Sequence, residues 1–257
     1  MYPILFRIGS LEVPSFGVML ATGILLAFAY FRRQCSPKEN PDALASLITF
    51  AVLAGLAGAR INYMLEHRDE IGGAADFFRM LFSRSGLTVY GGLALGTVAA
   101  ILYARRHRLP VLRILDAGAP AICIAYFFGR LGCQLAGDGD YGIPSSLPWA
   151  MAYPDGTVPT LERVHPTPVY EMILYSVLFL VLLAARKKLP EGKTFALFLV
   201  LAGVERFLIE FLRTNPRILW GLTEAQIVSV AVVIAGTAGL CRRIAGASAL
   251  PYNQKKE

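Results

Sequence analysis

The chain alternates between long apolar runs and short polar or basic segments. The apolar runs lie at 14–31, 43–65, 86–104, 111–129, 167–185, 194–212 and 224–241. A helix needs roughly 20 apolar residues to cross the hydrocarbon core of a bilayer. Within these runs polar and apolar side chains do not alternate with the period of two that membrane strands show. The pattern therefore predicts an all-α, polytopic membrane protein with about seven transmembrane helices.

Composition agrees with membrane embedding and limits the classes of partner. The chain is 55% hydrophobic and its mean hydropathy is +0.53, above the range of soluble globular domains. The formal charge of +7 could indicate a nucleic-acid partner, but the basic residues are not gathered in one patch. The four cysteines show neither metal-ligand spacing nor an extracellular pairing pattern. We therefore expect no nucleic acid, no metal and no disulfide framework.

The basic residues predict which way the chain crosses the membrane. They follow the first, third, fifth and seventh apolar runs, at 32–38, 105–108, 186–193 and 242–256. Short loops rich in lysine and arginine mark the cytoplasmic side of a membrane. The N-terminus is therefore predicted to lie outside, and the C-terminus in the cytoplasm.

On this topology the outer side carries two notable segments. Residues 134–166 are rich in glycine, proline, serine and aspartate, and are long enough to fold as a small extracytoplasmic head. We expect one integral membrane domain over 1–257, with this head inserted between the fourth and fifth spans. Residues 74–83 place Phe77 and Phe78 beside charged side chains. They form either an interfacial helix on the outer leaflet or an ordinary amphipathic loop helix.

Arg130 is the most informative single residue. It ends a long apolar run and opens a glycine-rich segment, 129–142, that also contains Asp138 and Asp140. A guanidinium at the edge of a bilayer is costly unless it faces a polar cavity, a counter-ion or a phosphate. Glycines let backbone N–H groups approach a ligand closely. The segment predicts a site for a lipid headgroup at one membrane face.

Other ionisable groups fall in the same outer half of the predicted membrane. The full set is Arg60, Tyr90, Arg130, His165, Glu171, Arg206 and Glu210. Arg206 and Glu210 are four residues apart, so they share a helix face and can pair. Such groups form either structural ion pairs between helices or a site for an anionic phospholipid, because a guanidinium fork matches phosphate oxygens.

Several stretches together resemble bacterial prolipoprotein diacylglyceryl transferases. Residues 129–142 are similar to the family signature, Gly-Arg-[Ile/Leu]-Gly-Asn, a short apolar stretch, Gly-Glu and a closing aromatic-Gly. Further matches are Gly58-Ala59-Arg60, Gly91-Gly92-Leu93, Asp116 with Ala119-Pro120, His165-Pro166 with Tyr170-Glu171, Arg206-Phe207 with Glu210-Phe211 and Arg213, and Leu222-Thr223 with Gln226. Their order and spacing cover nearly the whole chain.

The resemblance implies an enzyme of the bacterial inner membrane that needs no cofactor. Its donor would be phosphatidylglycerol, and its acceptor the lipobox cysteine that follows a prolipoprotein signal peptide. A thioether forms and glycerol phosphate leaves, in the first step of lipoprotein maturation. Arg130 would bind the donor phosphate, Arg206 would stabilise charge on the departing oxygens, and Glu210 would orient Arg206. The remaining matches imply substrate contacts at Arg60, Gly91, Gly92, Cys133, Asp138 and Gly142.

The chain departs from the family pattern at the position expected to activate the thiol. Tyr90 stands where the family usually has His before Gly-Gly-Leu. A phenol with a pKa near 10 is a poor general base, but it can orient a phosphate or a thiol. His165 is another catalytic candidate, as a proton acceptor alongside Asp138 and Asp140, or it is a helix-capping feature before Pro166.

Further departures leave other readings open. Cys133 replaces the usual Asn, Phe16 and Ala202 replace tyrosines, and Asp138 replaces the Glu of the signature. Cys133 is either a reactive thiol beside Arg130 or a small packing residue. The alternatives to the transferase are a non-catalytic or specialised phospholipid-binding relative and a small-solute transporter. The transporter is disfavoured because no inverted repeat is visible.

Overall fold

The computed structural model describes residues 1–9, 11–34, 41–82 and 88–242. The described chain is mostly helical and divides into two compact units. The first unit takes Met1–Gln34 and Leu115 onward, and the second takes Cys35–Ile114. The prediction of a mostly helical protein is confirmed.

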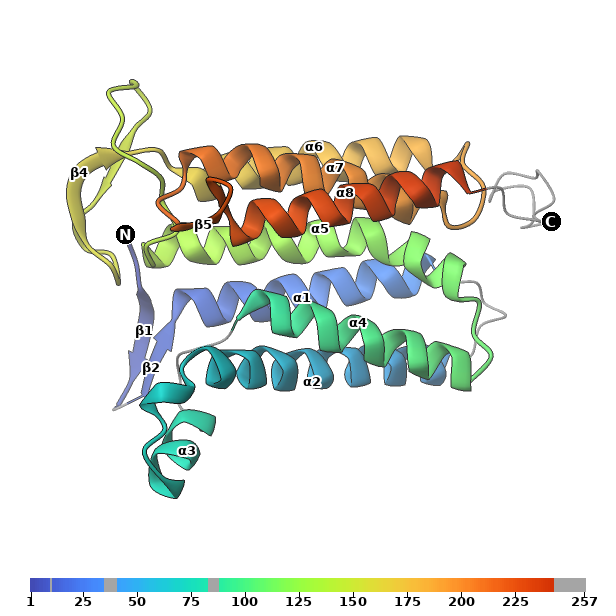
Figure 1. Ribbon diagram of the computed structural model, residues 1–257, viewed down its shortest axis with the longest axis horizontal. Coiled ribbons are helices and arrows are strands. Elements are labelled where there is room, and N and C mark those ends of the chain that lie inside the picture. The colour runs from blue at the N-terminus through green and yellow to red at the C-terminus, as the bar shows by residue number, and fades with distance from the viewer. Residues whose placement is uncertain (10, 35–40, 83–87, 243–257) are drawn as a thin grey trace. The chain divides into compact units, whose positions relative to one another are not determined.

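The first unit is built on five long helices. They are α1 (Ser15–Gln34), α5 (Val111–Ala136), α6 (Thr167–Ala185), α7 (Lys193–Ile209) and α8 (Glu224–Cys241). In Figure 1, α5 to α8 run side by side. Buried side chains of α5, α6 and α7 meet in one cluster, Ala119, Cys123, Tyr175, Leu178, Leu182 and Phe198. This packing fixes the ends of the three helices relative to one another.

Three short antiparallel hairpins, which the apolar pattern did not predict, belong to the same unit. They pair β1 (Ile4–Ile8) with β2 (Leu11–Pro14), β3 (Met151–Tyr153) with β4 (Thr160–Val164), and β5 (Arg217–Leu219) with β6 (Leu222–Thr223). The hairpins lie at one end of the helices (Figure 1). The β3–β4 hairpin falls within 134–166, and the extracytoplasmic head formed by this segment stays a prediction. Helix α5 extends two residues beyond the expected start of that segment, to Ala136.

Polar side chains also tie the first unit together at the opposite end. Asp116 of α5 accepts hydrogen bonds from the backbone N–H groups of Gly192 (2.5 Å) and Phe195 (2.8 Å). Because the first N–H groups of a helix have no partner within it, Asp116 caps α7 from a neighbouring helix. Lys193 donates to the carbonyl oxygens of Gly239 (3.0 Å) and Leu240 (2.6 Å) near the end of α8.

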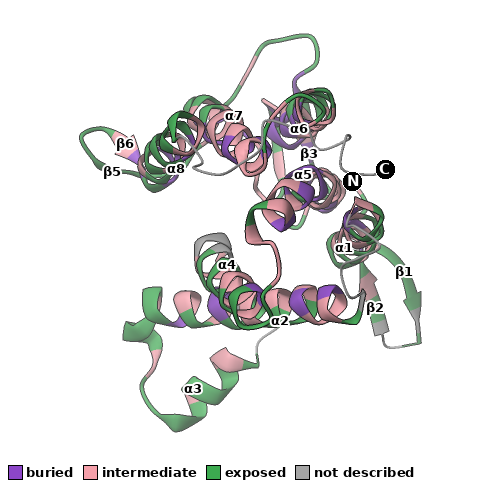
Figure 2. Cartoon of the chain, turned by 90° about the vertical axis from the view of Figure 1, so that its right-hand side faces the viewer, coloured by how far each residue is buried: buried purple, intermediate pink, exposed green. Residues whose placement is uncertain are grey.

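The second unit packs α2 (Pro41–Glu66) against α4 (Val89–Arg106), with η1 (Arg68–Glu70) and α3 (Ala74–Leu81) between them in sequence. Gly58 and Gly91 face each other so closely that a Cβ on either would clash with the other's carbonyl oxygen. Small residues allow membrane helices to approach in this way. Helix α3 has no buried residue and is coloured as exposed or intermediate in Figure 2. Phe77, Phe78 and Phe82 are exposed.

Five of the described helices are long and apolar enough to cross a membrane, namely α1, α2, α5, α6 and α8. The other two predicted spans correspond to α4 and α7. Helix α7 has 17 residues, because the chain tightens into the 3-10 helix η2 (Glu210–Leu212) at its end. A multi-pass membrane protein is therefore supported, while the count of about seven spans stays a prediction.

Candidate functional site

An ionic cluster lies where α5 ends, α6 begins and α7 ends, all within the first unit. Its members are three arginines and three carboxylates, Arg130, Arg206, Arg213, Asp140, Glu171 and Glu210. The two carboxylates on the helices are completely buried, and each arginine side chain is less than a quarter exposed. Buried charges persist only when they are paired and hydrogen-bonded, and these six balance one another in sign.

Glu171 is the centre of the ionic cluster. Its Oε2 lies 2.9 Å from Nε of Arg130, and its Oε1 lies 3.5 Å from a terminal nitrogen of Arg206. The hydroxyl of Tyr126 donates to Oε1 at 2.7 Å. Among the described residues, Glu171 is the acid that forms ion pairs with both Arg130 and Arg206.

Arg130 is held by three helices or loops at once. It pairs with Asp140 beyond the end of α5 and with Glu171 of α6. One turn back on its own helix, Tyr126 accepts a hydrogen bond from Nη2 at 2.9 Å, and the guanidinium carbon lies 4.9 Å from the ring centroid. These contacts leave the guanidinium fixed in direction, as a phosphate-binding group must be.

The predicted pair of Arg206 in α7 and Glu210 at the start of η2 is confirmed. Arg206 and Glu210 are 2.8 Å apart between Nη2 and Oε2, as expected for positions four apart on a helix. Asn215 donates to the other Glu210 oxygen at 2.7 Å, and Nε of Arg213 lies 3.8 Å from Oε2. Glu210 is thus contacted by Asn215 and Arg213 as well as by Arg206, and its role in orienting Arg206 stays a prediction.

Asp140 is brought to the ionic cluster by a turn that depends on glycine. Gly137 and Gly139 have φ values of 58° and 92°, in the left-handed region that favours glycine. The carboxylate of Asp140 then pairs with Arg130 and lies 2.5 Å from Arg213. Burial alone would raise the pKa of this carboxyl, but Arg130 and Arg213 outweigh it and lower the pKa to about 2. Asp140 is consequently a weak base.

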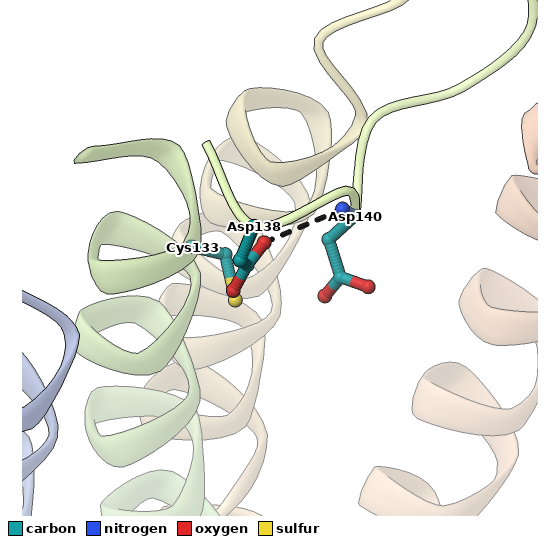
Figure 3. Close-up of side chains that lie close together, drawn as sticks. All are labelled: Cys133, Asp138 and Asp140. Atoms are coloured by element: carbon teal, nitrogen blue, oxygen red, sulfur yellow. Dashed lines mark hydrogen bonds between the residues drawn. The ribbon is translucent and has the colours of Figure 1, made fainter. Parts of the chain in front are cut away.

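Cys133, Asp138 and Asp140 lie close together, with ligand-type atoms all within 4.8 Å of one another (Figure 3). The backbone N–H of Asp140 donates to Oδ1 of Asp138 at 3.3 Å. Arg130 and Arg213, which pair with Asp140, would repel a cation placed here. The sulfur of Cys133, a buried residue, lies 3.9 Å from Nη1 of Arg130. Its reactivity stays a prediction.

His165 and Gly142 hold the start of α6 against the end of α7. The N–H of Gly142 donates to the carbonyl of His165 at 2.8 Å, and Gly142 also pairs with Arg213 in a β-bridge. A Cβ at Gly142 would meet the carbonyl of Leu212 and the side chains of Thr167 and His165, so only glycine fits. The cap residue of α6 is Pro166, so the His165-Pro166 pair stands at the start of the helix, and no side chain makes a cap hydrogen bond there.

The remaining predicted site residues, Arg60, Tyr90, Gly91 and Gly92, belong to the second unit. Arg60 donates to the carbonyl of Met80 in α3 at 3.2 Å. Gly91 and Gly92 pack against the backbone of α2. The side chain of Tyr90 lies outside the described residues. Their contacts with a substrate stay predictions.

The site contains two residues that the sequence had not placed in it. Tyr126 bridges Arg130 and Glu171, and its position four residues before Arg130 was the available signal. Arg213 pairs with Asp140 across 73 positions of sequence. A single sequence carries no signal for that distant contact, although Arg213 was part of the family-like stretch.

The arrangement is suited to binding an oxyanion. Arg130 and Arg206 meet on a single buried carboxylate, and their side chains keep 14% and 22% of their surface exposed. A phosphate oxygen reaching that exposed edge would find fixed donors in a medium of low dielectric, where such contacts are strong.

Several known proteins similar to this chain share one name, and a family model matches the chain. The model of the prolipoprotein diacylglyceryl transferase family matches residues 3–242. A phosphatidylglycerol–prolipoprotein diacylglyceryl transferase of Clostridium tetani is 30% identical, with 92% of this chain and 95% of the relative covered. Proteins of the same name are 30% identical in Trichormus variabilis, with 93% and 88% covered, and 32% identical in Bordetella parapertussis, with 93% of each chain covered.

The match runs through both units and includes every residue of the ionic cluster. It agrees with the resemblance seen in the motifs, and the relatives are covered over most of their own length. The chain belongs to the prolipoprotein diacylglyceryl transferase family.

Proposed function

We propose that this protein transfers the diacylglyceryl group of phosphatidylglycerol to the thiol of the lipobox cysteine in prolipoproteins. The reaction takes place at the outer face of the bacterial inner membrane, in a protein of about seven spans with its N-terminus outside and residues 134–166 as an extracytoplasmic head. The observation that carries the proposal is the meeting of Arg130 and Arg206 on the buried Glu171. Family membership supplies the reaction class.

Arg130 binds the phosphodiester of the donor, since it is the more rigidly held of the two arginines. Tyr126, Glu171 and Asp140 all contact it and fix its direction. Arg206, oriented by Glu210, stabilises the charge that grows on the phosphate as the bond to the lipid breaks. Both arginines act before and during the same step, so each is needed for the chemistry as well as for binding.

The chemical step is a displacement at the carbon that joins the diacylglyceryl group to the phosphate. The sulfur of the acceptor cysteine forms a bond to this carbon, and the carbon–oxygen bond to phosphate breaks. The thiol proton ends on the departing glycerol phosphate, which balances atoms and charge. Nearby guanidinium groups favour the thiolate form of a thiol. Asp140, with its pKa of about 2, is too weak a base to take this proton.

The other predicted site residues complete the proposal. Tyr90 orients the donor phosphate or the thiol, in the place where the family usually has His. Cys133, Asp138 and Gly142 contact the substrates. The substrate contacts of Arg60, Gly91 and Gly92 are proposed from the resemblance of their motifs to the family. His165, at the start of α6, lies beside Gly142 and acts on the outer part of the site.

The test is a transfer assay on purified protein in detergent that contains phosphatidylglycerol, with a lipobox peptide as acceptor and mass spectrometry of the product. We expect Arg130→Ala to lower the rate by about 100-fold or more, as the loss of a fixed oxyanion donor does. Arg7→Ala, at an exposed ion pair, serves as the matched control and should retain full activity. Transfer that survives in Arg130→Ala at the wild-type rate would contradict the assignment.

Tyr90→Phe tests the departure from the family pattern in the same assay. If the phenol orients a substrate, removing its hydroxyl should slow transfer by roughly 10-fold, the effect of about one hydrogen bond. An unchanged rate would remove Tyr90 from the site.

A further inference from the structure

A chain of three side chains links the head segment to the start of α6. The indole Nε1–H of Trp149 donates to the hydroxyl oxygen of Tyr170 at 2.7 Å. The same hydroxyl lies 3.2 Å from Nδ1 of His165. His165 and Tyr170 are half-buried, whereas Trp149 is 56% exposed. The proposed transfer reaction makes no use of Trp149 or Tyr170.

The hydrogen bonds among Trp149, Tyr170 and His165 indicate whether His165 presents a donor or an acceptor to a ligand. An indole N–H can only donate, so Tyr170 accepts from Trp149 and keeps its own proton to give. Among the described residues, Nδ1 of His165 is the acceptor that the structure provides for that proton. A neutral imidazole whose Nδ1 accepts must carry its hydrogen on Nε2. A protonated imidazole carries a hydrogen there too.

We assign the hydrogen of the neutral ring to Nε2, because Nδ1 then accepts from the Tyr170 hydroxyl. On this assignment Nε2 of His165 is a hydrogen-bond donor in either protonation state. It has no partner among the residues that the structure describes, and it is not sealed from solvent. A nitrogen that already carries a hydrogen cannot take a proton from a thiol. The tautomer thus argues against His165 as the general base and in favour of a contact with an oxygen of the substrate.

The position of His165 identifies which part of the donor it meets. Its backbone bonds to Gly142 and Ile143, and Gly142 bridges to Arg213 of the ionic cluster. His165 precedes the first residue of α6, outside the apolar segment, whereas Arg130 lies within α5. A lipid with its phosphate at Arg130 and its acyl chains along the helices directs its polar head outward, past His165.

We propose that His165 is a specificity-determining donor for the hydroxylated head of the lipid, held in its donor tautomer by Tyr170 and Trp149 as positioning residues. This inference rests on the proposed function. The ligand class is a phosphodiester whose alcohol carries free hydroxyl groups, because a hydroxyl oxygen accepts from Nε2–H. A head without an accepting oxygen leaves that N–H unpaired, and a site built for a hydrogen bond rejects such an analogue.

The experiment compares two donors of equal charge, phosphatidylglycerol and phosphatidylpropanol, whose head lacks the two hydroxyls. In the transfer assay we expect the wild type to favour phosphatidylglycerol by about 10-fold in kcat/KM, the value of roughly one good hydrogen bond. His165→Ala should bring that ratio to about 1 to 2, mainly by raising the KM for phosphatidylglycerol. The KM for the acceptor peptide should stay constant.

His165→Gln separates a donor from a base, because its amide nitrogen can donate from nearly the same place but cannot accept a proton. We expect this variant to keep most of the preference, and Tyr170→Phe and Trp149→Phe to lose part of it. His107→Ala is the matched control, since this exposed histidine lies in the second unit and stacks on Tyr103. Thermal unfolding of each variant checks that it is folded.

Each outcome decides between the two proposals. A wild type that transfers from neither donor contradicts the proposed function itself. A wild type that uses both donors equally, or a preference that survives in His165→Ala, overturns the inference alone. Equal loss of kcat with both donors in His165→Gln and His165→Ala would show that the residue is a base.

Discussion

Glu171→Gln is the perturbation that examines the ionic cluster most sharply. Glutamine has the size of the native side chain and keeps an oxygen that can accept from Tyr126. It removes the negative charge that lies 2.9 Å from Arg130 and 3.5 Å from Arg206, at a position with no exposed surface. The two guanidinium groups then face each other without the acid that separates them.

The expected cost follows from the burial of the group. Removing one partner of a buried ion pair typically costs about 3–5 kcal/mol, because a charge is left without compensation. Arg130 and Arg206 keep Asp140 and Glu210 as partners, so we take the lower value, about 3 kcal/mol. For a chain of this size that corresponds to a fall of about 6–12 °C in the unfolding temperature.

The assay can use the cysteines of the protein as reporters. Cys123 and Cys133 are 1% and 7% exposed, so a thiol-reactive dye labels them only after unfolding. Cys241 is exposed and reacts at the start. Glu162→Gln, on the exposed face of β4, is the control and should unfold as the wild type does. An unfolding temperature for Glu171→Gln within about 2 °C of the wild type would refute the reasoning, because the charge would then contribute almost nothing.

Three further predictions follow from other parts of the structure. Asp116→Ala should lower the free energy of unfolding by about 1–2 kcal/mol, because the α7 cap is lost. Asp155→Ala, at an exposed turn, is the control and should leave that free energy unchanged in the same dye assay. Gly58→Ala should destabilise the packing of α2 on α4 by about 1–3 kcal/mol. Gly73→Ala, with open space around it, should leave stability unchanged. The rate of proteolysis of the second unit measures both effects. Asp140 has a folded pKa of about 2 against about 4 unfolded, so the stability that it provides is present above pH 4 and is lost as the pH falls toward 2. Unfolding temperatures from pH 5 to pH 2 should show that loss in the wild type and not in Asp140→Asn.

The helices of the structure could be predicted from the sequence because their signal is local. A run such as 224–241 is apolar over its whole length, and helix α8 occupies Glu224–Cys241. The pair of Arg206 and Glu210 followed in the same way, since spacing along one helix brings them together.

The hairpins escaped prediction because their strands are short. Strand β3 has three residues and β6 has two, too few to display a period. All residues of β5 and three successive residues of β4 are exposed, so these strands show no alternation between buried and exposed positions. At the β5–β6 turn, Trp220 adopts a φ of 50°, which no propensity for tryptophan would suggest.

The composition of the ionic cluster was only partly predictable, for a related reason. Arg130, Arg206, Glu171 and Glu210 were identified as charges in or beside apolar runs, but nothing in the sequence showed which acid would join the two arginines. Asp140 reaches the cluster through the glycine turn before it, and that geometry depends on the packing of the head segment. Tertiary contacts determine both which acid joins the two arginines and where Asp140 lies.

The most direct test of the central claim is a product balance for the wild-type protein. Purified protein, phosphatidylglycerol and a lipobox peptide are incubated together, and both products are quantified by mass spectrometry. We expect one diacylglyceryl group on the cysteine sulfur for each glycerol phosphate released, and no product from a peptide with serine in place of that cysteine. A folded protein that binds the lipid yet yields neither product would contradict the account.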